Sequence, residues 1–137
     1  MTVLLVDAAN VVGSRPDGWW RDRAGATSRL LSRLAVLPGR SLPGPDGGVL
    51  VCGEVVAVVE GQARDVAAPE GVGVERATGS GDDALAACAS RRAAEGVPLL
   101  VVTADRGLRA RLPSGTQVAG PGWLLSLLDE IGCAPPA

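Results

Sequence analysis

The chain alternates between short apolar runs and longer segments in which apolar residues recur every three or four positions. The runs at 2–6 and 99–102 have no polar face, which indicates strands buried on both sides of a sheet. Shorter strands are expected at 72–76 and 116–119. Residues 49–52 and 55–59 flank Gly53 and predict one long or broken strand, with a hairpin as the alternative.

The periodic segments predict helices. They lie at 19–37, 80–95, 106–112 and 121–131. The first has an apolar face that begins at Trp20, and the segments at 13–18 and 40–48 are rich in glycine and proline and predict loops. Strands alternating with helices predict a single α/β domain over residues 1–137, a three-layer α/β/α sandwich with a mainly parallel central sheet.

The composition limits the reactions that this chain can catalyse, because it contains no histidine and all 13 of its basic residues are arginines. Catalysis by a Ser-His-Asp or Cys-His pair is therefore excluded, as are a histidine zinc site, a Walker A lysine and a Schiff base. The three cysteines are far apart and form no Cys-x-x-Cys pair, so we expect small buried or tail thiols. Carboxylates, hydroxyls, arginines or a metal must carry any reaction.

The N-terminal sequence indicates the compartment. It has no basic leader, and the run at 3–6 is too short for a signal peptide or a membrane span. We therefore expect a cytoplasmic protein without a membrane contact. A formal charge of −2 argues against strong non-specific binding of nucleic acid, although arginines gather locally at 15–23 and 106–111.

Acidic residues stand where the predicted strands end. Asp7 and Asp105 each follow an apolar strand, and Asp82 and Asp83 stand in a glycine-rich loop that leads into a helix. Because ligands bind outside the carboxyl ends of the strands in an open parallel sheet, we expect these side chains to face one crevice. Glu60, at the end of its own apolar run, would be a further acid at the rim.

Such a cluster predicts a divalent metal site. Neighbouring carboxylates raise one another's pKa unless a cation offsets their charge. Oxygen ligands suit Mg²⁺ or Mn²⁺, which would activate a water for attack on a phosphodiester, and a second ion would stabilise the leaving oxygen. Asp7, Asp83 and Asp105 are the predicted catalytic residues, and Asp82 joins them as a metal ligand.

Structural roles compete with these assignments. Ser80 and Asp83 match a capping box, Asp105 can cap the helix after it, and Asn10 can favour a left-handed turn. Arg15 and Arg106 flank the proposed crevice and can contact phosphate or simply face solvent.

Trp19 and Trp20 open a predicted helix. We expect at least one of them to anchor the core, and base stacking is the alternative.

Together these motifs resemble the NYN branch of the PIN-like nuclease superfamily, in particular its bacterial YacP-like group. The resemblance spans most of the chain and is carried by three motifs: Val-Asp7-Ala-Ala-Asn10-Val-Val, Gly-Asp82-Asp83 and Val-Thr103-Ala-Asp105-Arg106. It implies a PIN-like fold, a metal-dependent ribonuclease activity on RNA, and metal or substrate roles for Asn10 and Thr103. The chain departs from relatives in carrying Glu60 where they often have Asp, and in lacking lysines.

Other functions remain open at this point. The same metal site could hydrolyse a nucleoside triphosphate, or a degenerate site could serve a non-catalytic module that binds RNA or a partner. A haloacid-dehalogenase phosphatase is excluded, because Ala9 stands where its second Asp belongs. The expected partner is RNA, single-stranded by preference, and a homodimer is one option for the assembly.

Overall fold

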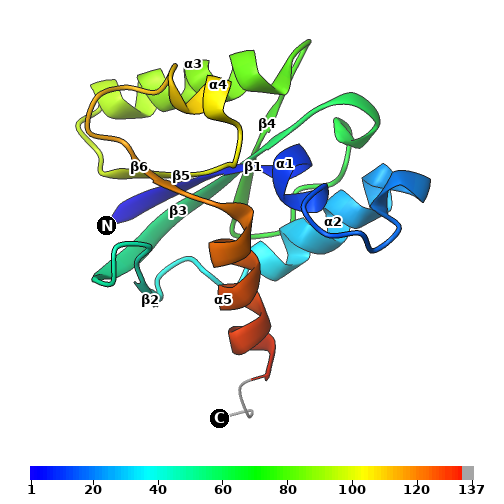
Figure 1. Ribbon diagram of the computed structural model, residues 1–137, viewed down its shortest axis with the longest axis horizontal. Helices are drawn as coiled ribbons and strands as arrows, with labels where there is room; N and C mark the ends of the chain where they lie inside the picture. The colour runs from blue at the N-terminus through cyan, green and yellow to red at the C-terminus, as the bar shows by residue number, and fades with distance from the viewer. Residues whose placement is uncertain (134–137) are drawn as a thin grey trace.

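The computed structural model describes residues 1–133, and its strands form one mainly parallel six-stranded sheet (Figure 1). The strands are β1 (Thr2–Asp7), β2 (Ser41–Pro43), β3 (Val49–Val59), β4 (Val72–Arg76), β5 (Leu99–Val102) and β6 (Gln117–Ala119). The helices are α1 (Ala8–Val12), α2 (Arg23–Leu34), α3 (Gly81–Ala94), α4 (Arg106–Arg109) and α5 (Pro121–Cys133), with 3₁₀ turns η1 (Trp19–Arg21) and η2 (Gly61–Ala63).

Strand β1 occupies the centre of the sheet. It pairs in parallel with β3 on one side and β5 on the other, while β4 extends the first side and β6 the second, also in parallel. After β1, the chain therefore adds β3 and β4 on one side of β1 and then β5 and β6 on the other side. The connections that leave β1 and β5 run in opposite directions, and an open parallel sheet leaves a crevice at such a point.

Both faces of the sheet are covered, because side chains along β1 alternate between two apolar clusters. Leu4 and Val6 belong to a cluster with α1, α2 and α5, whereas Val3 and Leu5 pack with α3 and α4. Figure 1 shows α3 and α4 on one side of the sheet and α2 and α5 on the other. The expected buried, mainly parallel sheet is confirmed.

Strand β3 runs unbroken through Gly53, so the hairpin alternative was wrong. Its first half pairs antiparallel with β2 and its second half in parallel with β4. The register against β1 shifts between Thr2 and Leu4, whose partners are Cys52 and Val55, so β3 carries one extra residue there. Such a bulge bends the strand, and glycine suits it.

Three further local expectations need correction. The predicted helix at 19–37 is divided, because the Asp22 side chain accepts a hydrogen bond from the Gly25 amide and starts α2 afresh. Trp20 is not part of the apolar face, since half of it is exposed (51%). Asn10 lies inside the short helix α1, and no non-glycine residue of the described chain has a positive φ.

Two of the three cysteines, Cys52 and Cys88, are free and buried as expected. The side chain of Cys133 lies outside the described residues. Along residues 1–133 no helix is both long enough and apolar enough to cross a membrane.

Candidate active site at the carboxyl edge of the sheet

Asp7 is the buried centre of the candidate site. It is the last residue of β1, is only 9% exposed, and its neighbour strand β5 ends one residue before Thr103. The fully buried Thr103 hydroxyl donates a hydrogen bond of 3.0 Å to Oδ2 of Asp7, and the Asn10 amide donates to Oδ1 at 3.3 Å. Both carboxylate oxygens are therefore oriented by the protein.

Asn10 connects the start of α1 to the loop after β5. Its side-chain oxygen accepts a hydrogen bond of 2.8 Å from the Ala104 amide, across 94 residues of sequence. The Thr103 hydroxyl in turn accepts from the Asp105 amide at 3.1 Å. Asn10 and Thr103 thus hold the two strand ends, β1 and β5, in a single arrangement and position the residues that follow them.

Asp105 has two roles in the structure. Its Oδ1 accepts a hydrogen bond of 3.0 Å from the Leu108 amide, so the helix-capping alternative is confirmed. The same half-buried side chain also lines a hollow shared with Asp7. Capping therefore fixes the carboxylate at the edge of the crevice and does not remove it from the site.

The two acids at the start of α3 point to different surroundings. Asp82 lines the same hollow as Asp7 and Asp105. The Asp83 side chain is 72% exposed and pairs with Arg111 at 2.8 Å, while its backbone amide donates to the Ser80 hydroxyl. Consecutive helix residues project about 100° apart, so only one of the pair can face the crevice directly. The structure places Asp82 there.

Glu60 is the fourth acid of the site. It follows β3 directly, and its Oε2 accepts a hydrogen bond from the Gly81 amide at the start of α3. A Cβ on Gly81 would overlap the Glu60 carboxylate, so a larger residue here would require the Glu60 side chain to move. The expected acid at the rim is therefore present, and its contact with Gly81 has no signal in the sequence pattern.

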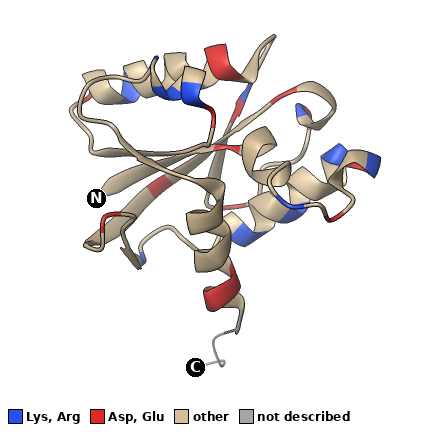
Figure 2. Ribbon diagram, viewed as in Figure 1, with Lys and Arg blue, Asp and Glu red and all other residues tan. Residues whose placement is uncertain are grey.

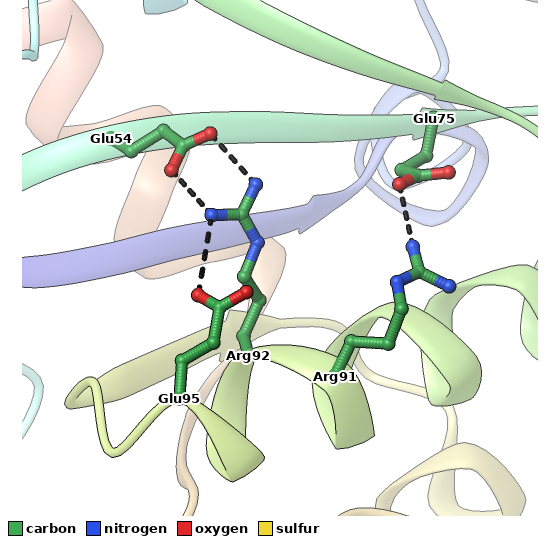
Figure 3. Close-up of polar contacts among 5 residues, drawn as sticks. All are labelled: Glu54, Glu75, Arg91, Arg92 and Glu95. Atoms are coloured by element: carbon green, nitrogen blue, oxygen red, sulfur yellow. Dashed lines mark hydrogen bonds and ion pairs between the residues drawn. The ribbon is translucent and has the colours of Figure 1, made fainter.

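Ion pairs fasten α3 to the sheet. Figure 3 shows two nitrogens of Arg92 facing the carboxylate of Glu54 on β3, and Arg91 reaching Glu75 of β4. The two hydrogen bonds from Arg92 to Glu54 are 2.6 and 2.8 Å long. A bidentate guanidinium–carboxylate pair fixes orientation as well as distance. These contacts hold the helix whose first turn carries Asp82.

We define the acidic hollow as the cavity of about 360 Å³ that these side chains surround. Its lining residues are Asp7, Ala9, Asn10, Glu60, Ser80, Asp82 and Asp105. They come from the ends of β1 and β3, from α1, from the loop after β5 and from the start of α3. Figure 2 shows acidic segments at the start of α3 and beside α1, with arginines on the helices of both sheet faces.

Crowded acids make ionisation harder in this hollow. Burial raises the pKa of Asp7, hydrogen bonds from Thr103 and Asn10 lower it, and the charges of Asp82 and Glu60 raise it further. The pKa of Asp82 is also raised, first by desolvation and then by the charges of Asp105 and Glu60. A cation in the hollow would relieve both effects.

The donor set fits a hard divalent cation, because every acidic donor is a carboxylate oxygen. Among the described residues, however, no three acidic or thiol side chains already stand close enough together to hold a metal ion. Asp7, Asp82 and Asp105 share one hollow, so loading a cation there would require some of these side chains to adjust.

Neither Arg15 nor Arg106 lines the acidic hollow. Arg15 forms a 2.9 Å ion pair with Asp129 of α5, which Arg33 also contacts, and these hydrogen bonds lower the pKa of Asp129. Arg106 is exposed on α4, beside Asp105. The sequence marks Arg111 only as one of three nearby arginines. In the structure its positive charge acts to lower the pKa of Asp82.

The comparisons with known proteins find a likeness at the level of the fold. No family model matches the sequence, and no curated protein matches it. The fold is similar to the crystal structure of a mutant of Rae1 (YacP) from Bacillus subtilis, with a TM-score of 0.68 and 19% sequence identity, covering 96% of this chain and 77% of that one. The two chains share a fold, which supports the YacP-like architecture that the sequence motifs imply.

Proposed function

We propose that this protein is a metal-dependent ribonuclease that hydrolyses phosphodiester bonds of single-stranded RNA in the acidic hollow, within a PIN-like α/β/α sandwich. The observation that carries the proposal is the convergence of Asp7, Asp82 and Asp105 in one hollow, at the point between β1 and β5 where the strand order reverses. The likeness to Rae1 (YacP) and the motif resemblance to YacP-like nucleases support the same assignment.

Mg²⁺ or Mn²⁺ is the proposed cofactor, held by Asp7, Asp82 and Asp105 with Glu60 as the nearest further acid. When bound, the cation would polarise the scissile phosphate and lower the pKa of an attacking water. With neither histidine nor lysine in the chain, carboxylates are the side chains available to accept a proton from that water. In this proposal Asp82 serves as the acid from the start of α3, in place of the Asp83 expected from the sequence.

The surrounding residues position these acids. Thr103 and Asn10 orient the Asp7 carboxylate, and the cap to Leu108 orients Asp105. Arg106 lies at the start of α4 and Arg111 just after its end, and they bring positive charge to an edge that must accept a phosphate. Positioned charge of this kind offsets the repulsion between a phosphodiester and a carboxylate cluster.

The test is a cleavage assay on the full chain with single-stranded RNA, single-stranded DNA and nucleoside triphosphates, each with Mn²⁺ and with EDTA. We expect cleavage of RNA that requires the cation and is lost in Asp105→Asn. Hydrolysis of triphosphates without RNA cleavage would support a nucleotide phosphohydrolase instead. RNA binding without hydrolysis of any substrate would support a non-catalytic module.

A further inference from the structure

A second hollow, of about 330 Å³, opens beside the acidic hollow, and we call it the Trp19 hollow. Its lining residues are Ala8, Ala9, Val12, Trp19, Arg23, Thr27, Val59, Glu60, Gly61, Gln62, Ala63 and Gly79. Ala9 and Glu60 line both cavities, so the two hollows are adjacent. A ligand that spans this boundary would meet carboxylates on one side and an aromatic ring on the other.

The Trp19 ring is held in place by its neighbours. Trp20 meets it edge-on, with the ring centroids 5.9 Å apart and the planes at 86°, and the Arg23 guanidinium lies 5.3 Å from its centroid. Trp19 is half-buried, whereas Trp20 is exposed and does not line the hollow. The hollow is thus lined by an indole and by the guanidinium that lies over it, and unpaired bases stack on both kinds of group.

The remaining walls combine small apolar groups with polar ones. Ala8, Ala9 and Val12 contribute side chains too small to fill the space, and Gln62 adds an exposed side-chain amide from η2. Within residues 1–132, no ion pair engages Arg23. A flat ring can therefore enter between apolar surfaces while its edge finds donors and acceptors.

We propose that the Trp19 hollow receives one unpaired nucleobase of the strand whose phosphate lies in the acidic hollow. The proposal rests on the proposed function for the identity of the strand, and adds to it the recognition of a base next to the reacting phosphate. The volume is at the small end of ligand pockets, which suits a single base. A base within a duplex could not enter, so such a site would favour single strands.

Tryptophan fluorescence tests the proposal without requiring cleavage. Single-stranded RNA is titrated into the full-length Asp105→Asn chain, which keeps the strand intact under the proposed function. We expect quenching that is lost in Trp19→Phe and retained in Trp20→Phe, the matched control. Binding should weaken by about tenfold in Trp19→Ala, the scale of one lost base stack. Equal effects at both tryptophans, or none at either, would overturn the proposal.

A second measurement leaves the protein unchanged, so folding of a variant is not at issue. Oligonucleotides carrying one abasic position are compared with the intact sequence and with a duplex. We expect about tenfold weaker binding when the missing base is next to the cleaved bond, and little binding of the duplex. Equal affinity for all three ligands would overturn the base site.

The two proposals fail in different ways. Trp19-dependent quenching in a protein that cleaves nothing would support the base site and contradict the ribonuclease. Cleavage of RNA with no Trp19-dependent quenching would overturn the base site and leave the ribonuclease standing.

Discussion

The Thr103 hydroxyl joins the ends of β5 and β1 by donating a 3.0 Å hydrogen bond to Oδ2 of Asp7. The two residues are 96 positions apart in sequence, and both are buried. The bond links β1 and β5, the two strands between which the strand order reverses. It orients the carboxylate of Asp7, which is central to the acidic hollow. Because the same hydroxyl accepts from the Asp105 amide, it sets the position of two of the four acids.

Thr103→Val should remove this connection while keeping the shape of the side chain. We expect a loss of about 1–3 kcal/mol in the free energy of unfolding, because a buried carboxylate loses a hydrogen-bond partner. Metal affinity or cleavage should fall about 10- to 100-fold, as for other groups that orient a metal ligand. Thr103→Ser keeps the hydroxyl and should restore most of both. Calorimetry with and without Mn²⁺ measures these effects, and equal behaviour of the Val and Ser variants would contradict this role.

Asp7→Asn should separate stability from function. The folded-state pKa of Asp7 is raised, so its carboxylate destabilises the fold progressively as pH rises from its ordinary value of 3.8 through the folded pKa. Without divalent cations, Asp7→Asn should therefore melt at the same temperature as the natural chain, or higher, at pH 7. The difference should shrink below pH 3.8, where both states are protonated.

The same variant should lose activity. Cation-induced stabilisation and RNA cleavage should fall by about a hundredfold or more, beyond the cost of losing an orienting group. Thermal melts across pH, with EDTA and with Mn²⁺, provide the measurement. A lower melting temperature for Asp7→Asn in EDTA would show that burial of this charge does not cost stability.

Asp82→Asn and Asp83→Asn form a matched pair on adjacent residues of α3. Asp82 lines the acidic hollow, so its variant should bind Mn²⁺ more weakly and cleave RNA at least about tenfold more slowly. Asp83 faces Arg111 and solvent, so its variant should retain most activity and lose at most about 1 kcal/mol of stability with the exposed ion pair. The reverse order would restore Asp83 as the catalytic residue.

Gly81→Ala should disturb the acidic hollow by moving the Glu60 side chain that lines it. The new methyl group would occupy the space of the Glu60 carboxylate and displace it from the start of α3. We expect weaker metal binding and slower cleavage, measured by titration of Mn²⁺ and by initial rates. Gly122→Ala is the control, because its Cβ would meet open space in the first turn of α5 and should stabilise the protein by at most about 1 kcal/mol. A Gly81→Ala chain with unchanged activity would exclude a role for the Glu60 contact.

Arg92→Ala should loosen α3 on the sheet. Its bidentate pair with Glu54 is partly exposed, so we expect a loss of about 0.5–1 kcal/mol in urea unfolding, less in high salt. Arg91→Ala removes a single contact to Glu75 from a more exposed position and should cost less. An equal cost for the two variants would show that the bidentate geometry adds nothing.

Much of the fold follows from local pattern. The runs at 2–6 and 99–102 predict buried strands because both faces of each are apolar, and their acidic ends predict a shared edge because parallel strands end on the same side of a sheet. The helix at 80–95 follows from its alanines and the glycine after it, and α3 confirms it within one residue at each end. Glu60 was also placed correctly at the rim, by its position after a strand.

Tertiary structure decided what adjacent residues do. Asp82 and Asp83 have the same chemistry, and so do Trp19 and Trp20, yet one of each pair lines a cavity while the other is more exposed. The choice depends on how a helix start is rotated against the sheet, which packing and ion pairs such as Arg92–Glu54 settle. Arg15 likewise does not line the acidic hollow, and it pairs with Asp129 of the distant α5. Sequence alone determined which residues reach this edge of the sheet, and packing between distant segments determined which of them face the hollow.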